Sequence, residues 1–514
     1  MELTKDIAVS ARLTAVIRTV LSDLGDTDPF LEGFLQESDP VRSLKLWFGV
    51  RLSTIEGMSR ELIVSLINRD IELIDRVLNQ IINDILHHRR FQQLEATWRG
   101  LFYLLRHTPD SGNVKIRVLD VTWEELSRDS ERAIEFDQTQ LFKKVYEEEF
   151  GMPGGCPFGL LLADYDVSHR VTVDHPTDDI AVLKSLASVA AAAFAPVVVG
   201  ARPELFGLES FDDLSRGIDL EKTFAQLEYI PWRSFCSSED ARFVGVTLPR
   251  VLVRRPYGNY TARNDRFPFR EEVRGRSYRN YLWGNAVYAF GAVAARSFST
   301  TSWFEDALGT TRDMIGGGLV TGLPGDSFDT DSAGVAPKFE TDVCITDELD
   351  RRFSTRGFIP LCHCKYTQFA AFYNAPSVNR PKEYVNRFAQ ANSVLSARLD
   401  LMLCVSRFAH YVKVMVRDQI GQFTSPRELS LYLNQWIQGY VIADPTPSPS
   451  SRGQYPLREA SIQIRENPTN PDCYFCTIHM KVHLDPKEAD AAVKFKTELP
   501  SFQNRPLGGL TRAV

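Results

Sequence analysis

The sequence predicts a mixed α/β protein with several domains, and three observations support this prediction. The chain has 514 residues, which is more than one small hydrophobic core accommodates. Apolar residues recur at helical spacing in the first 90 residues and again after residue 380. Between these regions, short apolar runs and a helical segment follow in strand–helix–strand order, which is typical of a sheet covered by helices on both faces.

Composition excludes several classes of protein. Hydrophobic residues make up 44% of the chain and charged residues 24%, as in ordinary globular proteins. The net charge of −7 argues against a dedicated nucleic-acid-binding protein. The longest uncharged run, 185–201, is short and contains Pro196, so we expect no membrane insertion. Eight cysteines are too few for a disulfide scaffold of this size, and no signal peptide is visible, so we expect a cytoplasmic bacterial protein with reduced thiols.

Residues 1–90 are predicted to form a helical N-terminal region. Six aliphatic residues follow steps of four and three and form a seam suited to another helix: Ile67, Ile71, Ile74, Leu78, Ile81 and Ile85. The pattern leaves open whether that helix belongs to this chain or to a second subunit. A second amphipathic segment follows, and its spacing predicts a buried core face without any reactive group: Phe91, Leu94, Trp98 and Leu101.

Residues 91–253 are predicted to form the α/β body. The expected elements are a helix at 179–195 and strands at 115–121, 158–163, 196–200 and 243–248. Residues 254–380 are rich in Gly, Pro, Arg and Asp, which predicts a loop-rich insertion that returns to the body.

Residues 381–442 are predicted to be the helical part of the body. Their apolar residues form a core face: Phe388, Leu395, Leu399, Met402, Phe408, Tyr411 and Met415. A further helix is expected over 425–440, with Ser425 as its cap and Pro426 in its first position.

Residues 443–456 are predicted to form a linker, because prolines alternate with small polar residues without any apolar period. The linker is expected to be extended and to carry residues 457–514 away from the body. In this tail apolar and polar residues alternate, which predicts strands that share one apolar face: Ala460, Ile462, Ile464, Cys476, Ile478, Met480, Val482, Val493 and Phe495. Three short strands with an uncovered face and unpaired edges favour completion by strands of another chain. The alternative, in which the tail folds back onto the body, stays open.

Acidic residues after a predicted strand invite a chemical interpretation. Asp164, Asp166 and His169 are residue types that bind metals or transfer protons, and Ser168 lies between them. Carboxylates at strand ends also cap helices and form turns. No nucleophile-elbow or phosphate-loop motif accompanies them.

Cysteines at short spacing suggest zinc. Cys362 and Cys364 flank a histidine, and Cys473 and Cys476 form a second pair. However, Cys473 and Cys476 are three residues apart in a predicted strand and therefore point to opposite faces. We predict no catalytic residue, metal site or cofactor, and hence a protein that is not an enzyme. A zinc-binding enzyme built around Asp164, Asp166 and the first cysteine pair is the competing interpretation.

A series of short motifs occurs in the same order as in one protein family. The first is Phe91-Gln-Gln-Leu-Glu-Ala-Thr-Trp-Arg-Gly-Leu101. Later motifs include Leu162-Ala-Asp-Tyr-Asp166, Arg202-Pro-Glu-Leu-Phe206, Tyr281-Leu-Trp-Gly-Asn285, Gly357-Phe-Ile-Pro-Leu-Cys-His-Cys-Lys365 and Ser406-Arg-Phe-Ala-His-Tyr411. Through these motifs, residues 85–465 resemble the large subunit of the contractile sheath of type VI secretion systems, the TssC/VipB family.

The resemblance implies a structural protein with a body like that of phage tail sheaths and a C-terminal strand arm completed by neighbouring protomers. It implies a small sheath subunit as a partner, which region 1–90 would bind, and further copies of the chain in a helical polymer. That polymer would surround a tube of hexameric rings, stand on a baseplate and contract to propel the tube. In these families a disassembly ATPase of the AAA+ class recognises a helix, and residues 7–24 are the candidate helix here. A specialised paralogue nearer the baseplate is the alternative within the family.

Overall fold

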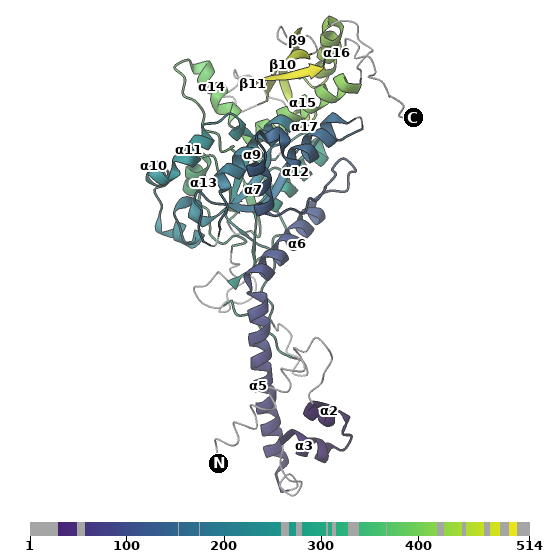
Figure 1. Ribbon diagram of the computed structural model, residues 1–514, viewed down its shortest axis with the longest axis vertical. Coiled ribbons are helices and arrows are strands. Elements are labelled where there is room, and N and C mark those ends of the chain that lie inside the picture. Colours follow the sequence, from purple (N-terminus) through teal and green to yellow (C-terminus); the bar gives the residue numbers. More distant parts are fainter. Residues whose placement is uncertain are drawn as a thin grey trace. The chain divides into compact units, whose positions relative to one another are not determined.

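The computed structural model describes most of the chain (Figure 1). The described residues are 29–48, 57–152, 154–173, 175–258, 267–273, 280–304, 307–310, 315–326, 339–365, 367–418, 426–444, 449–466, 473–483 and 493–500. Contacts divide the chain into two units, the first comprising Met1–Gln92 with Pro256–Tyr281 and the second comprising Gln93–Arg255 with Leu282–Val514. The candidate ATPase-binding helix at 7–24 lies outside the described residues, as does the predicted helix cap Ser425.

The first unit is built on a long helix, which Figure 1 shows as α5. Its helices are α2 (Pro29–Gln36), α3 (Pro40–Phe48) and α5 (Arg60–Leu86). Ser59 caps α5, because its side chain accepts a hydrogen bond from the Leu62 backbone N–H. The predicted helix is confirmed, and in the described structure the residues of its aliphatic seam are half-buried or exposed.

Two asparagines of α5 hold an extended segment of the same unit. The Asn79 Oδ1 accepts a hydrogen bond from the Arg270 backbone N–H at 3.0 Å. The Asn83 Oδ1 accepts one from the Glu272 backbone N–H at 2.8 Å. Their amide groups also donate to backbone carbonyls of Pro268 and Arg270. Polar side chains therefore fasten this segment to the helix.

The second unit contains a six-stranded mixed sheet with the order β1-β2-β3-β7-β8-β6. β1, β2, β3 and β7 run parallel, whereas β8 runs antiparallel to its neighbours β7 and β6. The strand bounds are β1 Leu161–Val167, β2 Val197–Ala201, β3 Val244–Leu248, β6 Leu319–Val320, β7 Ile359–His363 and β8 Ala370–Phe372. β4 (Val251–Leu252) and β5 (Trp283–Gly284) form a separate antiparallel pair of strands.

Helices cover both faces of the six-stranded sheet. α9 (Asp179–Ala193) packs in one hydrophobic cluster and α12 (Val287–Thr301) packs in another. Strand β2 contributes side chains to both clusters: Val197 and Val199 belong to the α9 cluster, and Val198 belongs to the α12 cluster on the opposite face. The predicted strands at 196–200 and 243–248 and the predicted helix at 179–195 are confirmed. The strand expected at 158–163 is present as β1, shifted toward the C-terminus.

Shorter helices fill the connections of the second unit. They are α7 (Trp123–Arg132), α8 (Gln140–Phe142), α10 (Leu220–Ala225), α11 (Ile230–Cys236), α13 (Asp347–Ser354) and α17 (Pro449–Gln454). A π-helix spans Lys143–Gly151, and five 3₁₀ turns span Phe136–Gln138, Pro203–Phe206, Phe211–Arg216, Leu227–Tyr229 and Asp240–Phe243.

The strand predicted at 115–121 is wrong. This segment is irregular and pairs with no strand of the described structure. Val118 is 69% exposed and Leu119 50%, so neither side chain is held against a core. The Arg117 guanidinium forms an ion pair with Glu149, which places the segment against the π-helix. An alternating pattern predicts a strand only where a neighbouring strand supplies hydrogen bonds.

The helical region after residue 380 consists of α14 (Arg387–Ser396), α15 (Leu399–Asp418) and α16 (Pro426–Gln438). Most of the predicted core face of α15 is buried, but Tyr411 is 37% exposed. α15 contributes residues to three hydrophobic clusters: Met402 to the α9 cluster, Leu403 to the α12 cluster and Phe408 to a third cluster near the C-terminus. The helix therefore connects the body to the C-terminal part of the chain.

The helix α6 (Arg89–His107) packs against α12 through a glycine. A Cβ on Gly100 would lie 2.3 Å from a ring carbon of Tyr288. The Tyr288 hydroxyl donates a 3.0 Å hydrogen bond to Asp164, so the ring is not free to move away.

Gly100→Ala is therefore expected to lower the free energy of unfolding by roughly 1–2 kcal/mol, because overpacking exceeds the gain in helix propensity. Chemical denaturation measures the effect. Gly33→Ala in α2 is the matched control, since no atom lies within 4 Å of its added Cβ. Equal stability of the two variants would contradict the packing described here.

Candidate functional site

The C-terminal sheet is the first candidate site. Its strands β9 (Leu457–Glu466), β10 (Cys473–Val482) and β11 (Val493–Pro500) are antiparallel, with β10 in the centre. The register places Ile478 between Ile462 and Phe495. It places Met480 between Ala460 and Val493. The predicted strands and their alternation are thus confirmed for β9 and β10, whereas the side chains of β11 are not among the described features.

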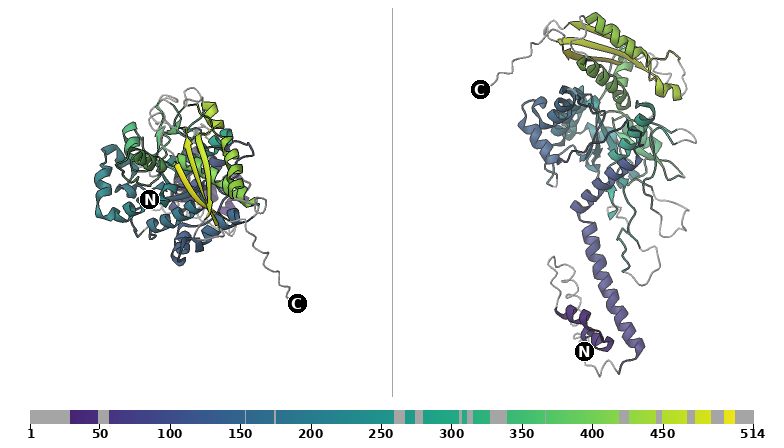
Figure 2. Two further views of the ribbon diagram at one scale, coloured as in Figure 1. Left: turned by 90° about the horizontal axis from the view of Figure 1, so that it is seen from above. Right: turned by 90° about the vertical axis from the view of Figure 1, so that its right-hand side faces the viewer.

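Helices of the same chain cover the apolar face of this sheet, as Figure 2 shows for α15 and α16. Cys476, Ile478 and Met480 are fully buried and Ile462 nearly so. Ala460, Ile464 and Val482 pack at the margin of the same cluster. The prediction of an uncovered apolar face is therefore wrong, and the alternative in which the tail folds back is correct for this face. Alternation in a strand identifies the apolar face but not what covers it.

The predicted extended linker is also wrong in its described part. Pro449–Gln454 form the short helix α17. The residues on either side of the linker are hydrogen-bonded to each other: the Ile442 backbone N–H donates to the Leu457 carbonyl at 2.9 Å, and the Leu457 N–H donates to the Tyr440 carbonyl at 3.2 Å. Because both ends meet, the segment cannot carry the sheet away from α16.

An exposed apolar stripe on α6 is the second candidate site. Leu94, Trp98, Phe102 and Leu105 are 58%, 64%, 63% and 53% exposed. Their spacing of four, four and three residues places them on one side of the helix. We name Leu94, Trp98, Phe102 and Leu105 the α6 stripe. Apolar side chains of this size in one continuous row are typical of an interaction surface.

The predicted core face of this helix is therefore wrong. Phe91, Leu94 and Trp98 are exposed and Leu101 is half-buried, whereas the buried residues of α6 are Gly100 and Leu104. Amphipathic spacing correctly identified one apolar side of the helix. It gave no indication that the opposite side, with its small glycine, packs against the body. Phe102 and Leu105 continue the same spacing, so the sequence pattern was sufficient to place them on the same apolar side of the helix.

The acidic residues expected after a strand lie within β1, and they and the following His169 have separate structural partners. Asp164 accepts hydrogen bonds from the Thr97 hydroxyl at 2.6 Å and from the Tyr288 hydroxyl at 3.0 Å. Asp166 accepts one from the Asn285 amide at 3.1 Å. His169 stacks on the ring of Tyr229 with a centroid distance of 4.1 Å. These contacts fasten elements of the body to one another, as buried polar groups commonly do.

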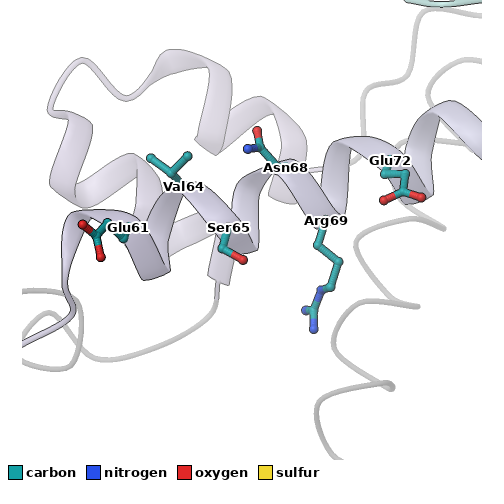
Figure 3. A pocket seen from close by; sticks show the side chains of 6 residues that line it. All are labelled: Glu61, Val64, Ser65, Asn68, Arg69 and Glu72. Carbon is teal, nitrogen blue, oxygen red and sulfur yellow. The ribbon is translucent and has the colours of Figure 1, made fainter.

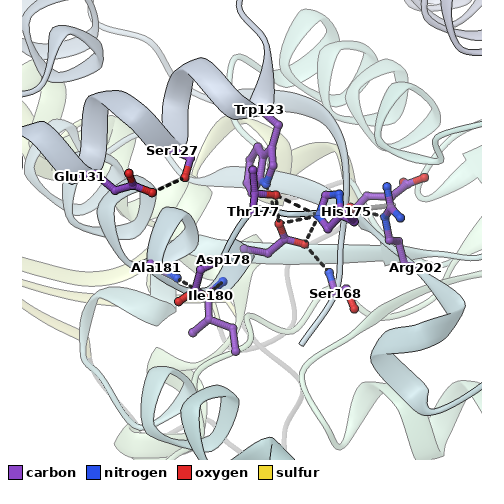
Figure 4. A network of polar contacts seen from close by, with 12 residues as sticks. Trp123, Ser127, Glu131, Ser168, His175, Thr177, Asp178, Ile180, Ala181 and Arg202 are labelled. Atoms are coloured by element: carbon purple, nitrogen blue, oxygen red, sulfur yellow. Dashed lines mark hydrogen bonds and ion pairs between the residues drawn. The ribbon is translucent and has the colours of Figure 1, made fainter. Parts of the chain in front are cut away.

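Asp179, at the start of α9, organises a neighbouring polar network (Figure 4). It accepts hydrogen bonds from the Trp123 indole N–H at 2.6 Å and from the Ser168 backbone N–H at 2.8 Å. The His175 Nε2 lies 2.7 Å from one of its oxygens, and the Thr177 hydroxyl donates at 3.1 Å. Each of its oxygens thus has more than one partner, so the network joins α7, the residue after β1 and the start of α9.

Burial raises the pKa of Asp166 to about 6, although the nearby Arg250 and Arg202 oppose this shift. The folded chain therefore holds this proton more tightly than the unfolded chain, whose carboxyl titrates near 3.8. This difference in pKa stabilises the folded chain fully below pH 3.8, and the stabilisation is lost as the pH rises through about 6.

We expect the second unit to gain about 1.3 kcal/mol of stability from this group on acidification from pH 7 to pH 5, since nearly all of the change falls within the one pH unit below the folded pKa of about 6. Asp166→Asn is expected to flatten this dependence, which melting temperatures across the range measure. Glu124→Gln, at an exposed position of α7, is the matched control. An unchanged slope in Asp166→Asn would contradict the assignment.

The cysteines do not support the zinc interpretation. Cys362 is buried in β7, and burial raises the pKa of its thiol. Burial likewise raises the pKa of Cys476 to about 12. Thiolates, not thiols, bind zinc. Among the described residues, no three His, Cys, Asp or Glu side chains are arranged to hold a metal ion. The side chain of Cys473 lies outside the described features.

A shallow hollow occurs on α5 (Figure 3). Its lining side chains come from one exposed helix: Glu61, Val64, Ser65, Asn68, Arg69 and Glu72. Side chains from several elements normally enclose a small-molecule site. This hollow is therefore a feature of a helix surface. In the part of the chain that the structure describes, no helix has both the length and the apolar character needed to cross a membrane.

Comparison with known proteins gives consistent matches to both units. The family model VipB, described as EvpB/VC_A0108 tail sheath N-terminal domain, matches residues 68–379. The model VipB_2, described as EvpB/VC_A0108 tail sheath gpW/gp25-like domain, matches residues 388–499. The chain is 38% identical over 434 residues to the type VI secretion system sheath protein TssC1 of Pseudomonas aeruginosa. That alignment covers 84% of this chain and 85% of the relative.

Proposed function

The chain belongs to the EvpB/VipB tail sheath family of type VI secretion systems as a large sheath subunit, and from this premise we propose that it polymerises with a small sheath subunit into a contractile sheath. The sheath surrounds a tube of hexameric rings in the bacterial cytoplasm, stands on a baseplate and shortens to propel the tube. The chain acts by assembly and not by catalysis.

The observation that carries this proposal is the position of α15. This helix packs in the two clusters of the six-stranded sheet and also under the C-terminal sheet. A force applied to the C-terminal sheet by a neighbouring protomer is therefore transmitted directly to the body. Fully packed interiors transmit strain because they have little free volume.

The small sheath subunit is the proposed occupant of the α6 stripe. An amphipathic helix of that subunit fits a row of apolar side chains at intervals of four, four and three residues. Burial of such residues contributes about 25 cal/mol per Å² of apolar area. Region 1–90, with the aliphatic seam of α5, is proposed as a further contact with this subunit.

Contraction requires no nucleotide in this proposal. The contracted state buries additional apolar surface between bodies, and a small gain per protomer is multiplied by the number of copies. Recycling of the contracted sheath by an AAA+ ATPase completes the cycle.

Co-expression with the small sheath subunit from the same bacterium tests the proposal. The purified material is viewed by negative-stain electron microscopy. We expect hollow tubes of uniform diameter that contain both subunits. Separate globular particles at every protein concentration would contradict polymer formation.

A further inference from the structure

The helix that follows α8 is wider than its sequence predicts. Lys143–Gly151 form a π-helix of nine residues, whereas π-helices in proteins are mostly single turns and frequently occur at functional sites. Tyr146 and Phe150 follow Phe142 at steps of four residues, which is α-helical spacing. Lys and Glu, which favour the α-helix, fill most other positions before Gly151. Because the local sequence favours an α-helix, contacts with the rest of the chain must impose the wider form.

Two cations of α15 hold the π-helix. The Lys413 ammonium lies 5.4 Å from the ring centroid of Tyr146 and 5.2 Å from that of Phe150. It also lies 5.0 Å from the ring of Phe194, the residue that ends α9. The Arg417 Nη1 donates to the Phe150 carbonyl at 3.1 Å and to the carbonyl of the residue after the π-helix at 3.0 Å. Cation–π contacts and charge-assisted hydrogen bonds thus fix the C-terminal turn of the π-helix.

The same turns of α15 pack under the C-terminal sheet. Val412 and Val416 belong to the hydrophobic cluster that also contains Ile478 of β10. Each valine is followed directly by one of the two cations, Lys413 or Arg417. Successive residues of an α-helix lie about 100° apart around its axis, so the valines and the cations occupy adjacent sides of α15. A displacement of the sheet that shifts these turns therefore also shifts the cations on the π-helix.

Glu149 connects the π-helix to other parts of the body. Its carboxylate is buried and forms an ion pair with Arg117 of the segment 115–121. Its other oxygen accepts a hydrogen bond from the Cys156 backbone N–H at 2.8 Å. In an α-helix each N–H bonds four residues back, and in a π-helix five, so a change of form turns Glu149 about the helix axis. Rewinding of the π-helix would thus break both contacts.

We propose that Lys413 and Arg417 keep Lys143–Gly151 in the π-helical form, and that displacement of α15 lets this segment rewind as an α-helix. This inference rests on the proposed function, in which α15 transmits force from the C-terminal sheet, and it specifies the element of the body that responds. The two cations are positioning residues, because they act through the π-helix. On rewinding, Glu149 releases Arg117, and the exposed segment 115–121 becomes free to change its position.

A crystal structure of the full chain with Lys413→Met and Arg417→Met tests the inference directly. Methionine keeps an unbranched side chain and removes each positive charge. We expect residues 143–151 to form an α-helix, with Glu149 separated from Cys156. The matched variant with Lys413→Arg and Arg417→Lys retains both charges and should retain the π-helix. A π-helix or a segment without order in the methionine variant would overturn the inference.

Hydrogen exchange of the unassembled chain provides a second measurement. Wild type and the methionine variant are compared with Arg128→Met, which removes an exposed cation of α7. We expect the methionine variant to accelerate exchange of the Cys156 amide by about tenfold and to leave the Val199 amide of β2 unchanged, whereas Arg128→Met changes neither. An unchanged Cys156 rate, or equal acceleration at Cys156 and Val199, would overturn the inference. Absence of tubes with wild-type protein would instead contradict the sheath function.

Discussion

Trp98→Glu is expected to lower the affinity of the chain for the small sheath subunit by about 100-fold or more. Trp98 is at the centre of the α6 stripe and is 64% exposed, so its replacement removes little packing within the chain. Central tryptophans in interfaces commonly contribute about 2–4 kcal/mol, and about 1.4 kcal/mol corresponds to a tenfold change in affinity. A buried carboxylate at this position adds the cost of its desolvation. Co-purification and binding titration with the small subunit measure the effect.

Gln93→Glu provides the control for charge, because Gln93 is also exposed on α6 but lies outside the stripe. We expect this variant to bind the small subunit normally. The melting temperature of Trp98→Glu should equal that of wild type, which distinguishes a lost surface from a lost fold. Normal binding by Trp98→Glu would exclude the α6 stripe as the site.

Ile478→Asp is expected to unfold the C-terminal sheet and to abolish tubes. Ile478 is fully buried between the sheet and the helices that cover it. An unpaired carboxylate at such a site costs more than about 4 kcal/mol, which is a large fraction of the stability of a domain. Limited proteolysis of the purified chain should cut within residues 457–500, and electron microscopy should find no tubes.

Thr477→Asp is the matched control for this substitution. Thr477 is the adjacent residue of β10 and lies on the opposite, half-buried face of the sheet. We expect this variant to retain proteolytic resistance and tube formation. Equal sensitivity of the two variants would contradict the division of the sheet into two faces. A deletion of residues 456–514 is a weaker test, because it would expose the apolar surfaces of α15 and α16.

The sequence predicted elements better than it predicted their partners. Alternation in 460–464 and 474–482 correctly identified the strands and their apolar face. It did not reveal the cover, because α15 and α16 come from a separate stretch of sequence and no local period encodes that contact. The same limitation explains α6, where the helical spacing of Leu94 and Trp98 was correct but the buried side was the one that contains Gly100.

Long-range pairing also explains the errors in the body. The alternating segment 115–121 has no neighbouring strand and is irregular. In contrast, residues 359–363 lie in a region interpreted as loop-rich and form a buried central strand, β7.

Export of the tube protein tests the central claim most directly, namely that this chain is the structural subunit that drives the tube. The tube protein is quantified in the culture medium of the bacterium after deletion of the gene for this chain. We expect release to be lost in the deletion strain, restored by the wild-type chain and by Gln93→Glu, and not restored by Ile478→Asp. Undiminished release from the deletion strain would contradict the proposed function.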